Sequence, residues 1–293
     1  MADISPTATA SRLALVTPAG GSADVPADVL ATARALFSAT PTERIRRDTH
    51  WTAHYLTGPT GAPPDTRALP AELSVAAVPT DLLDGPGLVV MDVDSTFITA
   101  EVVDELAGVA GTRTEVAAVT ARAMRGEIDF AESLRARVAT LAGIPVGVLS
   151  DLVGRLAYSP GAAELVAAVR ARGGRVGLVS GGFVEVIGPL AAPLGIDLIA
   201  ANRLENVAGR LTGRVVGEII DAAGKARHLA AFAQQLGLPM SRTVAVGDGA
   251  NDIAMIEAAG LGVAYCAKPV LVERAPARIT FARLDALCGL LDL

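Results

Sequence analysis

From residue 87 onward, short and continuously apolar runs of residues alternate with longer amphipathic runs. The apolar runs at 87–92, 175–180, 243–248 and 261–265 predict buried parallel strands. The runs between them are predicted to be helices. One helix is expected to open at Ser159, with Pro160 at its first position, and to end at Gly173 and Gly174. Strands that alternate with helices predict a doubly wound, Rossmann-like α/β fold.

An insertion of purely helical text, from about 104 to 158, separates the first of these strands from the second. Two pairs of residues in it have the spacing of a capping box, Thr112 with Glu115 and Asp129 with Glu132, and each pair precedes an amphipathic run. We expect a small helical cap over the carboxyl ends of the strands, which is where open α/β sheets bind their ligands.

The first 85 residues have a different texture. They contain nine of the 17 prolines, two strand-like runs at 13–16 and 73–78, and a helical run at 28–37. This pattern predicts a small α/β N-terminal domain over 1–85, which a boundary near Gly85 separates from a larger domain over 86–293.

The composition excludes several classes of protein. Of the 293 residues, 51% are hydrophobic and 19% are charged, which rules out intrinsic disorder. The net charge of -6 argues against nucleic acid and anionic membranes as partners, and we find neither a membrane-spanning run nor a signal segment. With two cysteines only, a reducing, cytoplasmic setting is expected. Only Lys225 and Lys268 are lysines among the 25 basic residues, and Lys268 is expected to face solvent.

Acidic side chains end two of the predicted strands. Asp92 and Asp94 are two residues apart on an extended chain and therefore point into the same crevice, where their charges repel. A divalent cation relieves this repulsion, and hard oxygen ligands favour magnesium. Asp248 ends another strand and Asp252 follows one helical turn later, so the sequence predicts a Mg²⁺ site formed by these carboxylates.

The remaining polar groups suit an anion. Ser180 ends a strand and is followed by Gly181, whose bare backbone can bring its amide against phosphate, and Lys225 supplies a compact positive charge. Together these groups predict phosphoryl transfer, in which Asp92 attacks phosphorus and Asp94 protonates the leaving alkoxide and then activates water. Each group alone also fits an ordinary turn or a helix surface. A dinucleotide loop at 247–252 is excluded because Asp252 takes the place of its third glycine.

The ordered motifs DVDST (92–96), SGGF (180–183), Lys225 and GDGAND (247–252) resemble those of the haloacid dehalogenase superfamily. Within it, the chain closely resembles the phosphoserine phosphatase family over about 87–293. The resemblance implies magnesium-dependent hydrolysis of O-phospho-L-serine through an aspartyl-phosphate, which is the last step of serine biosynthesis.

The resemblance also assigns roles to residues. It implies that Asp92 is the nucleophile and Asp94 the proton donor. Magnesium is then held by the Asp92 carboxylate, the Asp94 backbone carbonyl and Asp248, with Asp252 in support. Asn251 contacts the phosphate side of the substrate.

Selection of phosphoserine requires partners for its ammonium and carboxylate groups, because burying either group unpaired is costly. Glu101 suits the ammonium, and Arg135 and Arg137 are candidates for the carboxylate. Arg137 lies within the apolar stripe that begins at Phe130 and continues through Leu134, Val138 and Leu141, whereas Arg135 points elsewhere. The resemblance places the substrate arginine at this same position, with Met124 and Phe130 as apolar walls. In a rival interpretation Arg137 only extends from the stripe to solvent.

Longer members of the family carry small modules ahead of the catalytic part, and 1–85 resembles a small or truncated ferredoxin-like regulatory module. The analogy suggests that this segment mediates feedback by serine and the formation of a homodimer. Three alternatives stay open at this point. The chain could transfer the phosphoryl group to another hydroxyl, hydrolyse other small phosphomonoesters, or be an inactive α/β binding module.

Overall fold

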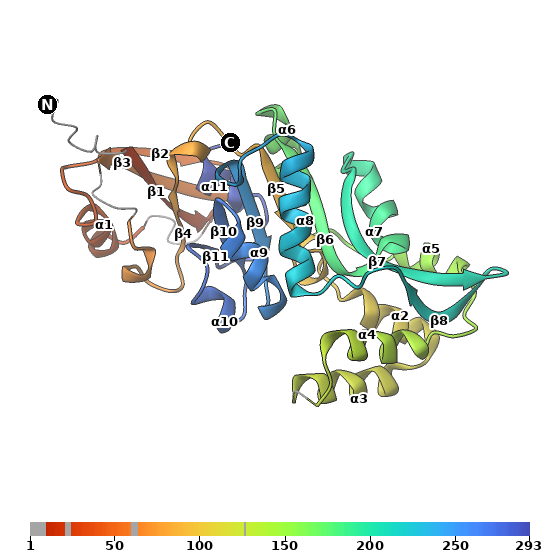
Figure 1. The fold of residues 1–293 in the computed structure, drawn as a ribbon. Helices are drawn as coiled ribbons and strands as arrows, with labels where there is room; N and C mark the ends of the chain where they lie inside the picture. The colour runs from red at the N-terminus through yellow and green to blue at the C-terminus, as the bar shows by residue number, and fades with distance from the viewer. Residues whose placement is uncertain (1–9, 21–24, 60–63, 126) are drawn as a thin grey trace, which may run out of the picture.

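The computed structural model describes residues 10–20, 25–59, 64–125 and 127–293. Its centre is a parallel sheet (Figure 1) built from strands β5 (Leu88–Met91), β6 (Arg175–Phe183), β7 (Leu198–Val207), β9 (Thr243–Gly247), β10 (Leu261–Tyr265) and β11 (Ala277–Ile279). Their spatial order is β7-β6-β5-β9-β10-β11. The chain therefore starts in the middle, builds outward in one direction and then returns to build in the other, which is the Rossmann order. The predicted strands and the doubly wound fold are confirmed.

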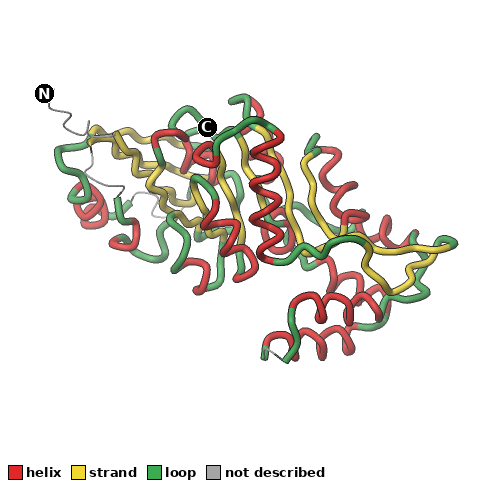
Figure 2. The backbone as a smooth tube through the Cα atoms, in the orientation of Figure 1, coloured by secondary structure: helices red, strands yellow, loops and turns green. Residues whose placement is uncertain are grey.

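Alternate residues of the central strands feed two apolar layers. In β5, Leu88 and Val90 pack on one face of the sheet, and Val89 and Met91 pack on the other. Figure 2 shows helices on both sides of the strands. The first face is covered by α8 (Ala222–Gln235), α9 (Ile253–Ala258) and α10 (Pro269–Val272), and the second by α6 (Ala162–Ala171), α7 (Val184–Ala191) and α11 (Ala286–Leu291). None of the described helices is long and apolar enough to cross a bilayer.

Helix α6 begins later than expected. It starts at Ala162, not at Ser159, because Gly161 adopts a left-handed conformation with φ of 82° and cannot be part of the helix. Its end agrees with the prediction, since Gly173 is also left-handed, with φ of 77°.

The helical insertion forms a lobe at the carboxyl ends of the strands (Figure 1), composed of α2 (Val102–Ala110), α3 (Arg113–Met124), α4 (Phe130–Ala139) and α5 (Gly147–Val153). The capping box of Asp129 and Glu132 is present. The one expected at Thr112 is wrong, because that side chain makes no cap bond and its hydroxyl lies 3.3 Å from the Thr140 hydroxyl instead.

A hairpin that the sequence pattern did not reveal joins the cap to the sheet. It consists of β7 and β8 (Arg210–Val216), which pair antiparallel. Its second strand lies against the loop after α4, where the Gly143 and Leu211 backbones and the Leu211 and Ile144 backbones are hydrogen-bonded at 2.8 Å. The cap therefore rests on an extension of the central sheet.

The N-terminal region contains β1 (Ala10–Pro18), α1 (Ala27–Arg34), β2 (Thr42–Arg47), β3 (Trp51–Pro59) and β4 (Ser74–Val78). The antiparallel order β2-β3-β1-β4 and the helix α1 match a ferredoxin-like unit in which the second helix is reduced to the short turn Thr66–Ala68. Strand β4 pairs antiparallel with β11, so that one sheet of eleven strands runs through the described chain. The described part of 1–85 thus shares its sheet with the part of the chain after residue 85. Its independence as a domain and its regulatory role stay predictions.

The C-terminal helix α11 closes the seam between these two parts. It packs on the N-terminal strands, where the Tyr55 hydroxyl donates to the Gly289 carbonyl at 2.8 Å. Just beyond the helix, Asp292 forms ion pairs with three arginines of the N-terminal strands, Arg12, Arg44 and Arg46. The two ends of the sequence therefore stabilise each other.

Candidate active site

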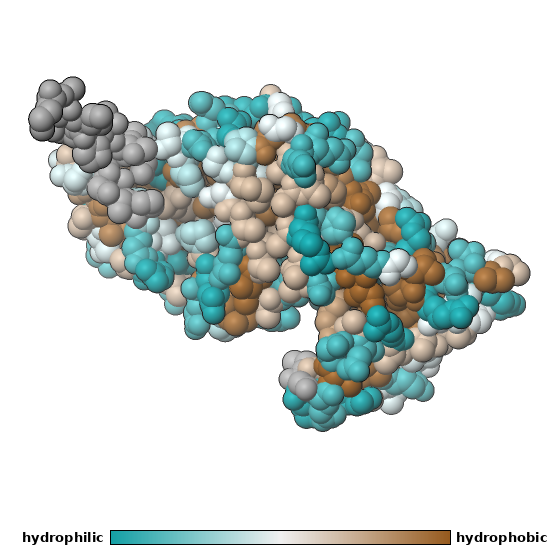
Figure 3. Space-filling model, viewed as in Figure 1, coloured by the Kyte–Doolittle hydropathy of each residue, from teal (hydrophilic) through white to brown (hydrophobic). Residues whose placement is uncertain are grey.

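A polar cavity of about 140 Å³ lies where the carboxyl ends of β5, β6 and β9 meet the cap. Drug-sized ligands occupy pockets of roughly 300–1,000 Å³, so this cavity suits a small metabolite. The space-filling view shows a notch between the body of the molecule and the lobe of α3 and α4 (Figure 3). The cavity is lined by residues from both parts: Asp92, Asp94, Glu101, Val103, Phe130, Arg137, Gly181, Asp248, Asn251 and Lys268.

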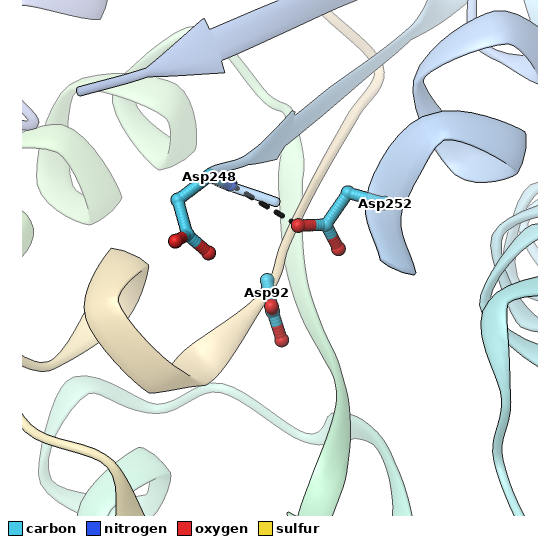
Figure 4. Close-up of side chains that lie close together, drawn as sticks. All are labelled: Asp92, Asp248 and Asp252. Atoms are coloured by element: carbon cyan, nitrogen blue, oxygen red, sulfur yellow. Dashed lines mark hydrogen bonds between the residues drawn. The ribbon is translucent and has the colours of Figure 1, made fainter. Parts of the chain in front are cut away.

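Three carboxylates converge at the base of the site. Asp92 follows β5, Asp248 follows β9, and Asp252 belongs to the turn that leads into α9. Each contributes one oxygen to a group in which these atoms lie within 4.8 Å of one another, and Figure 4 shows the three side chains close together. Acidic oxygens this close together are the donors that a hard divalent cation requires.

The three carboxylates are not equivalent. Asp252 is fully buried and engaged on both sides, since Oδ1 accepts from the Lys225 ammonium at 2.7 Å and Oδ2 accepts from the backbone N–H groups of Asp248 and Gly249 at 3.1 Å. Within the described part of the chain, no hydrogen-bond donor reaches the Asp248 carboxylate, which faces the cavity. Asp252 is thus arranged to orient its neighbours, and Asp248 is free to take a ligand.

Asp92 shares Lys225 with Asp252. The Lys225 ammonium reaches from α8 to within 2.7 Å of Asp92 Oδ2, and Oδ1 accepts from the Val93 N–H at 2.7 Å. Burial raises the pKa of the Asp92 carboxyl, the Lys225 charge opposes this, and the Asp252 and Asp94 carboxylates add to the rise. Burial lowers the pKa of Lys225, but the two carboxylates outweigh this effect and hold the pKa above its ordinary value. Lys225 therefore stays charged beside the candidate nucleophile.

Asp94 lies in a tight turn after Asp92. The N–H groups of Phe97 and Ile98 bond to carbonyls five residues earlier, and Ser95 takes a left-handed conformation with φ of 56°. This geometry turns the Asp94 carboxylate back toward the cap, where Oδ1 accepts from the Val102 N–H at 2.9 Å. Burial, followed by the nearby Glu101 charge, raises the pKa of Asp94 to about 7. A carboxyl with that pKa can both donate and accept a proton near neutral pH.

Strand β6 contributes Gly181 to the wall of the cavity. The Ser180 hydroxyl is fully buried and accepts from the Gly182 N–H at 2.8 Å, while Gly181 itself faces the cavity. A Cβ atom at Gly181 would lie 3.0 Å from the Phe130 ring, which is tighter than ordinary contact. Phe130 of the cap therefore closes directly onto a glycine of the core.

Asn202 supports this loop and was missed by the sequence analysis. Its side chain is buried, donates to the Gly181 carbonyl at 2.8 Å and accepts from the Ile220 N–H at 2.9 Å. The one feature of the sequence that could have indicated this role is a polar amide side chain within the apolar run that forms β7.

The cap places charged groups on the opposite wall. Arg137 is half-buried and lines the cavity, whereas Arg135 is exposed. Burial lowers the pKa of the Arg137 guanidinium, and the charges of Asp104, Glu101 and Asp94 oppose that effect. The Glu101 carboxylate accepts from the Ser95 hydroxyl at 2.8 Å. A cation and an anion therefore face the same small space.

The structure brings most of the predicted site residues to the cavity wall and leaves others behind it. Ser180, Lys225 and Asp252 are buried behind the wall, where they contact the lining residues. The Asn251 amide donates to Asp92 Oδ2 at 3.5 Å. Met124 ends α3, and its side chain lies outside the described residues. Lys268, expected only to face solvent, is exposed but also lines the cavity.

Comparisons with known proteins agree with this geometry. Residues 89–257 match the model of the haloacid dehalogenase-like hydrolase family. The chain is 54% identical over 206 residues to phosphoserine phosphatase SerB2 of Mycobacterium tuberculosis, which covers 70% of this chain and 50% of that protein. It is 48% identical over 206 residues to the phosphoserine phosphatase of Streptococcus thermophilus, covering 70% of this chain and 96% of that protein.

Among solved structures, a HAD family hydrolase, t0658 from Salmonella enterica, superposes with a TM-score of 0.83 at 28% identity and covers 97% of this chain and 98% of that one. The likeness to that protein thus includes the N-terminal strands. The chain matches about half the length of the Mycobacterium relative.

Proposed function

Because the chain belongs to the haloacid dehalogenase-like hydrolase family, we propose that it hydrolyses O-phospho-L-serine to L-serine and inorganic phosphate. The observation that carries this proposal is the composition of the cavity wall. Two carboxylates of the core, Asp92 and Asp94, face Arg137 of the cap and Glu101, which lies directly before the cap. The first pair suits a phosphate ester, and the second pair suits the carboxylate and ammonium groups of an amino acid.

In the first step, a carboxylate oxygen of Asp92 attacks phosphorus and forms an aspartyl-phosphate while the bond to the serine oxygen breaks. Asp94 gives its proton to this leaving oxygen, for which its pKa of about 7 is suited. In the second step, Asp94 takes a proton from water, whose oxygen attacks the same phosphorus. Phosphate leaves, and the Asp92 carboxylate is restored.

The acidic cluster fits Mg²⁺ as the cofactor. The Asp92 and Asp248 carboxylates and the Asp94 backbone carbonyl are the ligands that we propose, and Asp252 holds this arrangement through Lys225 and the Asp248 backbone. When bound, the ion supplies positive charge to the phosphoryl oxygens and relieves the repulsion between the carboxylates.

The other groups bind and orient the substrate. Lys225, the Ser180 hydroxyl, the Gly181 amide and the Asn251 amide are proposed to hold the phosphoryl oxygens. On the cap side, Arg137 pairs with the substrate carboxylate and Glu101 with its ammonium. The Phe130 ring forms an apolar wall that excludes water.

Phosphate release from a panel of small phosphomonoesters, with and without Mg²⁺, tests the function. We expect L-phosphoserine to be the preferred substrate, activity to require Mg²⁺, and Asp92→Asn to abolish turnover. Preference for another ester would overturn the assignment of substrate. Phosphorylated alcohols formed in the presence of acceptor alcohols would identify a phosphotransferase, and an inactive wild type would indicate a binding module.

The proposed reaction is the last step of serine biosynthesis, in the cytoplasm. Cys266 and Cys288 are free thiols, which suits a reducing compartment. The homodimer expected from the family likeness is tested by light scattering of the purified chain, in which a monomer at all concentrations would refute it.

A further inference from the structure

Both lysines of this chain are at the catalytic cavity. The sequence has 25 basic residues, of which only Lys225 and Lys268 are lysine. Lys225 contacts Asp92 behind the wall, and Lys268 lines the cavity itself. An ammonium is a compact charge that can approach one phosphate oxygen closely, whereas a guanidinium is a broad planar fork. Lysine therefore takes the place of arginine only at the two positions beside this cavity.

Lys268 is held in place by its backbone. It lies between β10 and α10, its N–H donates to the Asp248 carbonyl at 2.9 Å, and Pro269 restricts the chain directly after it. The ammonium lies above the glycine turn after β9, because a Cβ atom built on Gly249 would be 3.8 Å from Lys268 Nζ. The side chain thus extends over the loop that carries Asp248 and Asn251.

The Lys268 ammonium forms no ion pair within the described part of the chain, although, against the larger effect of burial, its charge lowers the pKa of Asp248 from a distance. Among the described residues, no carboxylate lies within ion-pair distance of its ammonium. Lys225, in contrast, is shared between Asp92 and Asp252 at 2.7 Å each. The cavity wall carries four carboxylates, so an incoming dianion needs a cation that is not already neutralised.

We propose that Lys268 is a further substrate-binding residue, whose ammonium contacts the phosphoryl group of the ester and the phosphate product at the core side of the cavity. This inference rests on the proposed function. Arg137 of the cap and Lys268 of the core would then bind the two anionic ends of one substrate. Lys225 acts behind them on the nucleophile.

Binding of inorganic phosphate to the full chain at saturating Mg²⁺, followed by calorimetry, tests the inference. We expect Lys268→Gln to weaken phosphate binding about tenfold, as for the loss of one charge-assisted contact. Lys268→Arg should recover only part of it, because the charge is kept but the guanidinium is broader. Arg135→Gln is the matched control, since it removes one positive charge from an exposed position off the cavity, and it should leave phosphate binding unchanged.

A separate measurement of Mg²⁺ affinity distinguishes a direct contact of Lys268 with phosphate from a role of Lys268 in holding the Asp248 loop in place. Removing a cation near the metal ligands leaves Mg²⁺ affinity equal or higher, whereas loosening the loop lowers it. Weaker phosphate binding with undiminished Mg²⁺ binding supports the inference. Unchanged phosphate binding in Lys268→Gln, or an equal loss of both affinities, overturns it. Hydrolysis of phosphoserine by the wild type, assayed in parallel, tests the proposed function independently of these results.

Discussion

Asparagine substitutions at Asp252 and Asp248 should have opposite consequences, although both residues belong to one acidic cluster. Asp252 accepts the Lys225 ammonium on one oxygen and two backbone N–H groups on the other. An asparagine side chain has only one oxygen, so in Asp252→Asn the amide N–H₂ faces either the Lys225 ammonium or the two backbone N–H groups. Lys225 also keeps only one carboxylate partner. Asp248→Asn removes no described hydrogen bond, and it lowers the repulsion within the cluster.

The sizes of the two effects follow from these contacts. Breaking one partner of a buried ion pair costs about 3–5 kcal/mol, so Asp252→Asn should lower the melting temperature by on the order of 10 °C. Asp248→Asn should change the free energy of unfolding by no more than about 0.5 kcal/mol, as at sites without such contacts. The order reverses for Mg²⁺, because Asp248 is the proposed ligand. Asp252→Asn should weaken Mg²⁺ binding by about 10- to 100-fold, and Asp248→Asn should weaken it further.

Urea unfolding in EDTA measures the free energy of unfolding, and calorimetric Mg²⁺ titration of the folded variants measures the Mg²⁺ affinity. Working without metal matters, since bound Mg²⁺ would stabilise the folded state of the wild type and hide the comparison. Equal destabilisation by the two substitutions would refute the division between an orienting and a metal-binding carboxylate.

Three further outcomes are expected. Arg137→Ala should raise KM for phosphoserine about 10- to 100-fold, since a charge-assisted contact is lost, and Arg135→Ala should do little; equal effects would remove the argument from helix faces. Burial raises the pKa of Asp94 to about 7, against about 4 unfolded, so the folded form binds this proton more tightly and metal-free stability should fall as the pH rises between these values. Asp94→Asn should reduce that fall in urea titrations at several pH values, and an unchanged slope would contradict it. Burial raises the pKa of the Asp292 carboxyl, but its contact with Arg44 outweighs this effect and lowers the pKa. The ionised carboxylate therefore stabilises the fold above about pH 4, and this stabilisation is lost at more acidic pH. Asp292→Asn should cost about 1–2 kcal/mol at pH 7 and converge with the wild type in acid; a constant difference would contradict this.

The sequence could predict the features that depend on local pattern. The central strands are uninterrupted apolar runs, and the polar residues that follow them lie at one edge of a parallel sheet by topology alone. The position of Arg137 followed from helical spacing, because a residue seven positions after Phe130 must share its face.

Features that depend on tertiary pairing were missed. The β7–β8 hairpin turns through Ala208 and Gly209, both with positive φ, and an alanine gives no signal of such a turn where asparagine would. The start of α6 shifted because Gly161 must fit beside Asp285, a contact far along the chain. Lys268 was missed because its approach to the cavity depends on a backbone bond to Asp248 that no local pattern encodes.

The seam between β4 and β11 has a consequence for biosynthesis. The ribosome makes β1–β4 well before β11, which continues their sheet, and α11, which covers their inner face. The strands β1–β4 therefore cannot reach their final state until β11 and α11 have emerged, and such non-local pairing is slow to form. A chain that lacks α11 would expose Trp51 and Tyr55 to solvent, in the condition that chaperones and proteases recognise. The burial of the N-terminal strands thus depends on a helix that is synthesised much later.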